Sequence, residues 1–238
     1  NSWFEISFDN IKTIIWTDPW NCGANLEGIF PSFTVPYKKF KTPDYVFISH
    51  IHDDHYDKNI ISYLPENTKF IIKNFEDNLL KKFLISFGVS ESNIIVIDPW
   101  VEFELENNIK LLIIPQIQSN SNDIESDTDY DLDTAVFIKY KDQCFFNQVD
   151  MALDDEHLSQ VYSKAKSILN FNKINLYSRV FGAGSEYPQC FLNINRASES
   201  RRVKNSCLEE FCKSTLVTNP DYIIPAGASY QLSSERKI

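Results

Sequence analysis

Apolar residues near the start of the chain alternate with polar ones, which is the pattern of a β-strand with one buried face. Two such segments, residues 3–8 (WFEISF) and 11–17 (IKTIIWT), are separated by an Asp-Asn pair that favours a turn. We therefore expect a β-hairpin that ends at Asp18, where an Asp-Pro pair marks the next turn.

A different pattern occurs at residues 44–49 (DYVFIS), where the apolar run is nearly continuous, as in a strand buried on both faces. The mostly polar segment 50–57 follows directly. From Lys58 the apolar spacing becomes helical, and Asp57 is suited to cap that helix. The polar segment therefore lies on a loop between a strand and a helix.

The rest of the chain continues this mixture of strand and helix patterns. Further strands are expected at residues 69–73, 93–97, 101–105, 109–114, 134–140, 143–148, 173–180 and 221–225, and helices at 76–88, 155–168 and 205–216. The order indicates a mixed α/β protein in which two sheets pack together and helices cover their outer faces.

The length and composition fit one folded unit. A chain of 238 residues with 43% hydrophobic residues can bury a large core, so we expect one domain spanning residues 1–238. The sequence starts at Asn1 without Met and stops soon after its last apolar run, and we expect that it is a fragment trimmed at both ends. No run approaches the roughly 18 apolar residues of a membrane span, and no export signal is visible.

Charge and cysteine content narrow the function classes. A net charge of -10 does not suit binding to a phosphate backbone, so a nucleic acid is not an expected partner. The five cysteines are odd in number and have no CxxC or CxH spacing, which argues against a disulfide framework and a cysteine metal site. We expect a cytoplasmic protein with reduced thiols.

The loop after the strand at residues 44–49 carries the chemistry. Its sequence SHIHDDHYD contains three of the four histidines of the chain. Imidazole and carboxylate groups at this density are typical of a site for one or two transition-metal ions, with zinc, iron and manganese the metals that suit them. The alternative is a histidine-rich surface loop. The ligand-type residues are His50, His52, Asp54 and His55. The fourth histidine, His157, follows three acidic residues on a predicted helix and is expected to be solvated or to cap the helix.

HxHxDH after a strand, with Asp18 in TDPW and Asp150 in FNQVD, resembles the metallo-β-lactamase superfamily, which implies an αββα four-layer sandwich. More narrowly, the sequence is similar to the catalytic region of CMP-N-acetylneuraminate hydroxylases. The shared motifs, in order, are TDPW, SHxHxDH, the acidic-x-Asp-Thr of DLDTA, the Asn-x-Val-Asp of FNQVD, FGAGSEYPQCF and a closing PAG.

The resemblance implies a ligand set. The implied ligands are His50, His52, Asp54, His55 and Asp150. The first two would hold one ion with Asp150, and Asp54 and His55 would hold a second ion that Asp150 bridges. Asp18 would orient a histidine from outside the ligand set. An Asp-Pro turn explains Asp18 equally well.

The sequence departs from the hydrolytic members at two points. A histidine after the middle strands and another after the last strand are missing, and only Gln116 and Gln118 stand near the first point. Asp129, just before the acidic-x-Asp-Thr motif, is a possible oxygen ligand. A solvated acidic loop is the alternative. Candidates for a substrate pocket, or for an ordinary tight loop, are Gly182, Gly184, Tyr187 and Gly227.

Three functions remain in competition. The first is hydrolysis of an ester or phosphoester in a small anionic metabolite by metal-activated water, with Asp54 or Asp150 handling the proton. The second, implied by the resemblance, is iron-dependent hydroxylation of a sugar nucleotide, which requires a separate electron donor because this chain has no Rieske motif. The third is a metal-binding scaffold without catalysis.

Overall fold

The first sheet contains the opening hairpin. In the computed structural model, which describes residues 3–21, 29–31, 36–117, 124, 133–181, 192–227 and 230–232, this sheet has the strand order β1-β2-β4-β5-β6. Its strands are β1 (Phe4–Ser7), β2 (Ile14–Thr17), β4 (Tyr45–Phe47), β5 (Lys69–Lys73) and β6 (Ile94–Ile97). The predicted hairpin is confirmed, since β1 and β2 pair antiparallel, and the other neighbours pair parallel.

The second sheet contains the later strands in the order β12-β11-β10-β9-β8-β7. Its strands are β7 (Phe103–Glu104), β8 (Ile109–Ile114), β9 (Ala135–Tyr140), β10 (Gln143–Asn147), β11 (Leu176–Val180) and β12 (Tyr222–Ala226). The predicted hairpin of β9 and β10 is present, and Lys141 in its turn has a φ of 53°. A small additional sheet pairs β3 (Ile29–Pro31) with β13 (Tyr230–Leu232), neither of which was predicted.

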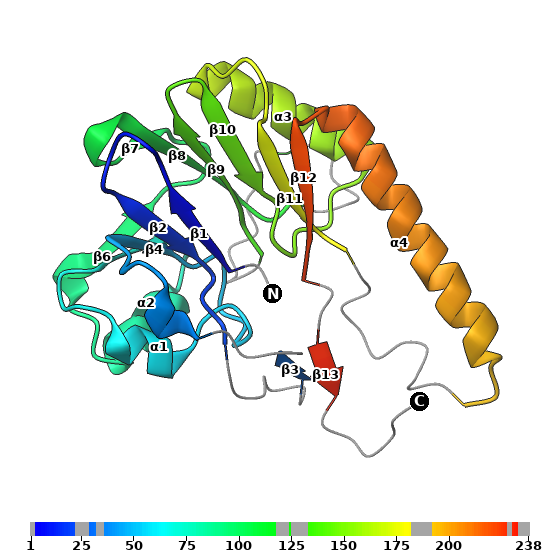
Figure 1. Ribbon diagram of the computed structural model, residues 1–238, viewed down its shortest axis with the longest axis horizontal. Coiled ribbons are helices and arrows are strands. Elements are labelled where there is room, and N and C mark those ends of the chain that lie inside the picture. The colour runs from blue at the N-terminus through cyan, green and yellow to red at the C-terminus, as the bar shows by residue number, and fades with distance from the viewer. Residues whose placement is uncertain are drawn as a thin grey trace.

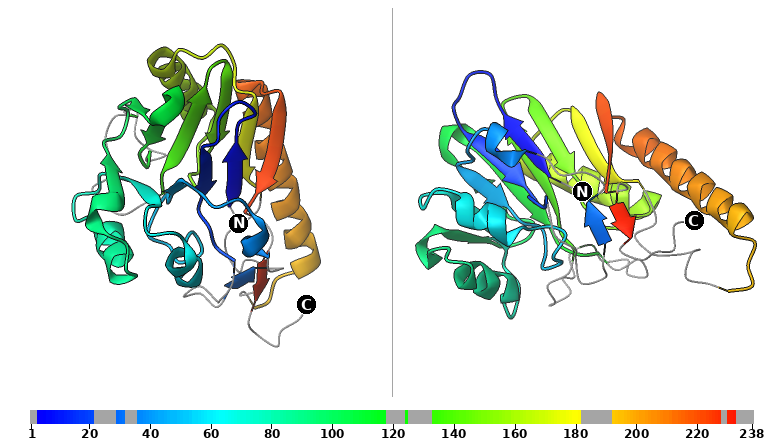
Figure 2. Two further views of the ribbon diagram at one scale, coloured as in Figure 1. Left: turned by 60° about the vertical axis from the view of Figure 1, so that its left-hand side comes forward. Right: turned by 60° about the horizontal axis from the view of Figure 1, so that its bottom comes forward.

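Helices cover the outer faces of both sheets (Figures 1 and 2). The helices are α1 (Lys58–Tyr63), α2 (Leu79–Ser86), α3 (Asp155–Leu169) and α4 (Arg196–Thr218), with 3-10 turns η1 (Tyr37–Lys39), η2 (Glu91–Asn93) and η3 (Glu106–Asn108). Asp57 caps α1 as predicted, by accepting a hydrogen bond from the backbone N–H of Asn59. The expected α/β architecture of two sheets between helical layers is confirmed.

Three apolar clusters hold these layers together. Between the sheets, Phe47 and Ile71 of the first meet Ile113 and Val136 of the second, and all four are fully buried. A second cluster packs α1 and α2 against the first sheet, and a third packs α3 against the second. Each buried Å² of apolar surface contributes about 25 cal/mol to the free energy of folding, so these three clusters are the main source of stability.

Two helices differ from their predicted lengths. The helix predicted at residues 76–88 starts at Leu79, because Asn78 has a left-handed backbone that interrupts the helix. The helix predicted at 205–216 starts earlier, after Asn195, whose side chain accepts a hydrogen bond from the backbone of Ser198. The N-terminal end of this helix, α4, projects away from the sheets (Figures 1 and 2) and has little apolar patterning, which is why periodicity missed it.

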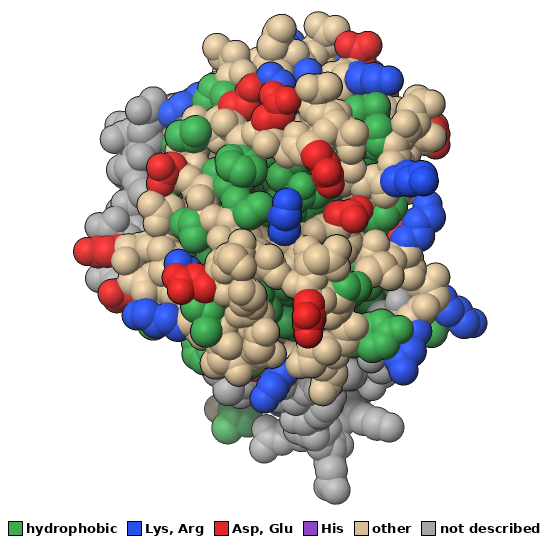
Figure 3. Space-filling model, turned by 90° about the vertical axis from the view of Figure 1, so that its left-hand side faces the viewer, with side chains coloured by type: hydrophobic (Ala, Val, Ile, Leu, Met, Phe, Trp, Pro, Cys, Tyr) green, Lys and Arg blue, Asp and Glu red, His purple; other side chains and the backbone are tan. Residues whose placement is uncertain are grey.

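The surface carries interspersed charges. On the side of the molecule drawn in Figure 3, acidic and basic side chains alternate around small groups of hydrophobic ones. None of the helices in the described part of the chain combines the length and the apolar character that crossing a membrane requires.

Candidate metal centre

The ends of several strands meet at one edge of the two sheets. Because β2 and β4 are parallel, Asp18 after the first and His50 after the second leave the first sheet on the same side. In the second sheet β10 runs antiparallel to β9, so Asp150 after β10 comes close to Asp133, which precedes β9. Both sheets therefore contribute polar side chains to this edge.

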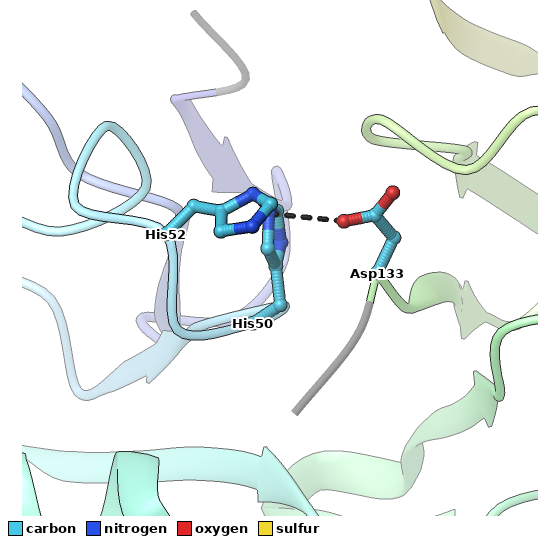
Figure 4. Close-up of side chains that lie close together, drawn as sticks. All are labelled: His50, His52 and Asp133. Atoms are coloured by element: carbon cyan, nitrogen blue, oxygen red, sulfur yellow. Dashed lines mark hydrogen bonds and ion pairs between the residues drawn. The ribbon is translucent and has the colours of Figure 1, made fainter. Parts of the chain in front are cut away.

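His50, His52 and Asp133 point toward one another (Figure 4). The Nε2 atom of His50 lies 2.8 Å from Nδ1 of His52 and 3.1 Å from Oδ1 of Asp133. One ligand atom from each residue lies within 4.8 Å of the other two. Two ligand atoms that each lie about 2.1 Å from a shared ion are about 3.4 Å apart in a tetrahedral site, and the 2.8 and 3.1 Å contacts are close to that spacing.

His50 has too few N–H groups to donate a hydrogen bond in each of its close contacts. Nδ1 of His50 is hydrogen-bonded to the hydroxyl of Ser49 at 2.8 Å, and burial, followed by the charges of His55 and His52, lowers the pKa of His50 well below its usual value. A neutral ring has one N–H at most, yet Nε2 faces both His52 and Asp133. A cation would satisfy all three atoms at once, so the residues fit a bound metal ion.

His55 lies between carboxylates from both sheets. Its Nε2 lies 3.0 Å from Oδ2 of Asp150, and its Nδ1 lies 3.4 Å from Oδ2 of Asp18. Burial acts to lower the pKa of His55, but Asp150 and Asp18 together raise it well above the usual value. Burial acts to raise the pKa of Asp150, and His55 holds it below its usual range. With His50, this pair forms a second group of three metal-ligand atoms within 4.8 Å.

Asp18 occupies a fully buried position with a left-handed backbone, φ 40°. Its Oδ1 accepts a hydrogen bond from the backbone N–H of Ser49 at 2.8 Å. Burial raises its pKa, while His55 and Ser49 act in the opposite direction. The carboxylate therefore meets His55 on the ring nitrogen that faces away from Asp150, where it can orient the ring.

Thr134 ties the two sheets together beside the site. Its hydroxyl donates a hydrogen bond of 2.6 Å to the backbone carbonyl of Ser49, and both residues are fully buried. Since Asp133 precedes Thr134 and His50 follows Ser49, this bond holds the two candidate ligands next to each other. The arrangement gives the threonine of the acidic-x-Asp-Thr motif a structural role.

Known proteins resemble this chain in fold but not in sequence. No family model and no curated protein sequence matches the chain. Among solved structures, a possible metal-dependent hydrolase from Veillonella parvula DSM 2008 has a TM-score of 0.56 at 15% identity, covering 97% of this chain and 96% of that one. An isothiocyanate hydrolase from Delia radicum gut bacteria has a TM-score of 0.56 at 14% identity, with the same coverage. The solved structures that this chain resembles include members of the metallo-β-lactamase superfamily.

The chain has the metallo-β-lactamase fold. A mutant of the CmlA beta-hydroxylase is a third neighbour, with a TM-score of 0.55 at 11% identity. The comparison covers 93% of this chain, which spans only 43% of that hydroxylase. The neighbours thus include both hydrolytic and hydroxylating enzymes of the metallo-β-lactamase fold.

Within this metallo-β-lactamase fold, most of the predicted site residues come together. Both three-atom groups are built from His50, His52, His55 and Asp150 together with Asp133. Asp54 lies at their margin, with its Oδ2 atom 3.9 Å from Nε2 of His55 and its side chain 31% exposed. Asp18 lies beside the ring that it was expected to orient.

Asp133 is the residue that sequence reasoning missed. The resemblance predicts a ligand just before the acidic-x-Asp-Thr motif, at Asp129, which lies outside the described residues. The usable signal was the position of Asp133 just before the buried strand β9, since the histidines also lie next to a strand end, although after the strand β4. Burial and the charge of Asp150 raise the pKa of Asp133, which marks it as a carboxylate in a crowded acidic site.

The substrate-pocket candidates are not placed in the site by the described residues. Gly182, Gly184, Tyr187 and Gln118 are outside the described residues. Gly227 has a φ of 75°, and a Cβ atom there would lie 2.3 Å from Cγ2 of Val180. Glycine at this position is therefore explained by the close packing of β12 on β11. Its role in a substrate pocket stays a prediction.

His157 is buried and bonded to the residue that caps helix α3, rather than solvated. The residue is 7% exposed, and its Nδ1 lies 2.8 Å from Oδ2 of Asp154, whose other oxygen accepts from the His157 backbone N–H. Asp154 is the N-cap of α3. This histidine takes no part in either group of candidate ligands.

Proposed function

We propose that this chain is a metal-dependent hydrolase that cleaves an ester or phosphoester bond of a small anionic metabolite with metal-activated water. The observation that carries the proposal is the convergence of two ligand groups on one edge of the fold, with His50 in both. Separate ion pairs would not bring three imidazoles and two carboxylates from both sheets to one place.

The two metal positions share the site between the sheets. His50, His52 and Asp133 would hold one ion, and His55 and Asp150 would hold a second, which Asp54 would complete from the margin. Asp133 takes the place that the resemblance assigned to Asp150 in the first position. This assignment supplies a carboxylate where hydrolytic relatives have a further histidine.

A divalent metal in this site would lower the pKa of a coordinated water toward about 7 and polarise the bond to be cleaved. The protein must then keep its ligands available and move a proton. Asp150 is held as a carboxylate by His55, which suits a ligand. Asp54 is the more exposed group beside His55, so it is the better placed of the two predicted proton carriers.

An anionic substrate is compatible with the acidic chain only if metal ions held by these residues supply local positive charge. Gly182, Gly184, Tyr187 and Gly227 are the residues we propose for the pocket wall. The chain carries no basic excess, so nucleic acid is not a proposed substrate. We place the reaction in the cytoplasm, where free thiols persist.

A second candidate function rests on the composition of the first position. His50, His52 and Asp133 make up two imidazoles and one carboxylate, a set that binds non-haem iron in oxygenases. The hydroxylase among the structural neighbours is compatible with this chemistry. The substrate would then be a sugar nucleotide, and a separate protein or domain would supply electrons.

Metal analysis and activity assays decide between these functions. Protein purified without added metal is analysed for zinc, iron and manganese, then assayed with p-nitrophenyl esters and phosphodiesters. The hydrolase proposal expects turnover with zinc or manganese that D54N reduces, together with a lower occupancy of the second metal position while the first stays filled. Oxygen consumption by the iron-loaded protein with a chemical reductant would favour the hydroxylase. Protein that takes up no metal contradicts both.

A further inference from the structure

The backbone just before Asp150 has an unusual conformation. Val149 has a φ of 54°, in the left-handed region, and its side chain is 1% exposed. A β-branched residue is rare there because its Cβ substituents crowd the neighbouring backbone. Such conformations persist only where the surroundings hold them in place. The turn that presents Asp150 must therefore be held by its neighbours.

Gln148 supplies most of that support. Its backbone N–H donates to the carbonyl of Ser178 at 2.9 Å, which fixes the start of the turn to β11. Its side-chain amide donates to the carbonyl of Met151 at 2.5 Å, on the other side of Asp150. Its own carbonyl accepts from the Met151 N–H at 3.3 Å. The turn is therefore closed by one residue that spans it.

Tyr177 in turn fixes Gln148. The tyrosine hydroxyl donates a hydrogen bond to the side-chain oxygen of Gln148, and both residues are buried. The Tyr177 ring is stacked on Phe146 with centroids 5.2 Å apart, in the core between the second sheet and α3. Burial raises the pKa of Tyr177 to about 12, so the hydroxyl remains a donor. This tyrosine is in neither candidate ligand group.

We propose that Gln148 and Tyr177 are positioning residues, which hold the strained turn at Val149 and thereby aim the Asp150 carboxylate at His55 and at the second metal position. The inference rests on the proposed metal centre for its consequence in binding. It assigns a role to a buried tyrosine on the opposite face of the sheet from the inter-sheet core. The orientation of the Asp150 carboxylate would be fixed because its turn is bonded, through Gln148, to Tyr177 in the core between the second sheet and α3.

The test compares Y177F with Y140F. Tyr140 lies at the far end of β9, so Y140F makes the same chemical change in the same sheet away from the site. Binding of Co²⁺ to metal-free protein is followed by calorimetry and by the visible spectrum. Y177F is expected to weaken the binding at the second position about 10-fold and to change the cobalt spectrum, while Y140F does neither.

Two further measurements keep the outcome decisive. Q148M keeps the length of the side chain but removes its two side-chain hydrogen bonds, and the double variant Q148M/Y177F should bind cobalt no more weakly than Q148M alone. In metal-free protein, the NMR signal of the His55 Nε2–H held by Asp150 should be lost in Y177F and kept in Y140F.

Additive losses in the double variant, or a Y177F protein with cobalt binding and an NMR signal like those of Y140F, would overturn the inference. Wild-type protein that binds no cobalt would contradict the proposed function instead. In that case the His55 signal still decides the positioning role, since its loss in Y177F alone supports the role and its retention opposes it.

Discussion

His55 Nε2 and Asp150 Oδ2 lie 3.0 Å apart, although one residue follows a strand of the first sheet and the other follows a strand of the second. The contact exists only when the two sheets are packed in their native register. The candidate metal centre is thus a product of tertiary structure, even though four of its residues are close together in the sequence.

Replacement of His52 by alanine should remove most of the bound metal with little effect on folding, because the His52 side chain is exposed and supplies a ligand atom rather than core packing. Metal content measured by mass spectrometry checks this. H157Q is the control, since His157 lies outside the candidate site and should leave the metal content unchanged. Full metal occupancy in H52A would contradict the ligand assignment.

Replacement of Asp133 tests the residue that the sequence alone did not reveal. D133A should lose the ion of the first position and leave His55 and Asp150 to bind the second. D133H should retain an ion there and shift the preference from iron toward zinc, because a third imidazole replaces the hard oxygen ligand. Competitive loading with the two metals measures that preference. If D133H had the same preference between iron and zinc as the wild type, the assignment of Asp133 as a ligand would be contradicted.

The N-cap of α3 gives a prediction about stability. Asp154 accepts a hydrogen bond from the backbone of His157 at 2.8 Å, so D154A should lower the free energy of unfolding by about 1 kcal/mol. D154N keeps a good capping acceptor and should lose much less. Urea denaturation of the metal-free proteins measures both changes. An equal loss in the two variants would show that the charge, rather than the cap, stabilises the helix.

The cysteines should differ in reactivity. Cys144 is buried in the core beneath α3, and burial raises the pKa of its thiol to about 12, whereas Cys212 is exposed. Alkylation at pH 8, followed by peptide mass spectrometry, should modify Cys212 in the folded protein and Cys144 only after denaturation. Modification of Cys144 at the rate of Cys212 would mean that this core opens readily.

Much of the site could be predicted because its histidines lie close together in the sequence. The histidines after β4 come from one loop, and the apolar run before them identified the strand end. The likeness to CMP-N-acetylneuraminate hydroxylases rests on motifs alone and stays a prediction. Asp133 could not be placed by such reasoning, because its position beside His50 depends on how two sheets pack and on the Thr134 bond to Ser49.

The fold was predicted with similar strengths and weaknesses. Strands with continuous or alternating apolar residues were found close to their observed bounds. The first half of α4 was missed because residues 196–204 have no apolar face, so its helical structure follows from capping at Asn195 and helix propensity. β3 and β13 were missed because each is a short segment stabilised by pairing with a distant partner.

The hydrogen bond of Thr134 to Ser49 lies where the two sheets meet, and metal ions held by ligands from both sheets would cross-link the sheets there. Such ions bind the closed molecule and not the unfolded chain, so each would add to its stability by mass action. A cell short of the right metal would then lose more than an activity. The metal-free protein would unfold more often and would be degraded faster by proteases. The supply of metal would then influence the cellular concentration of the protein.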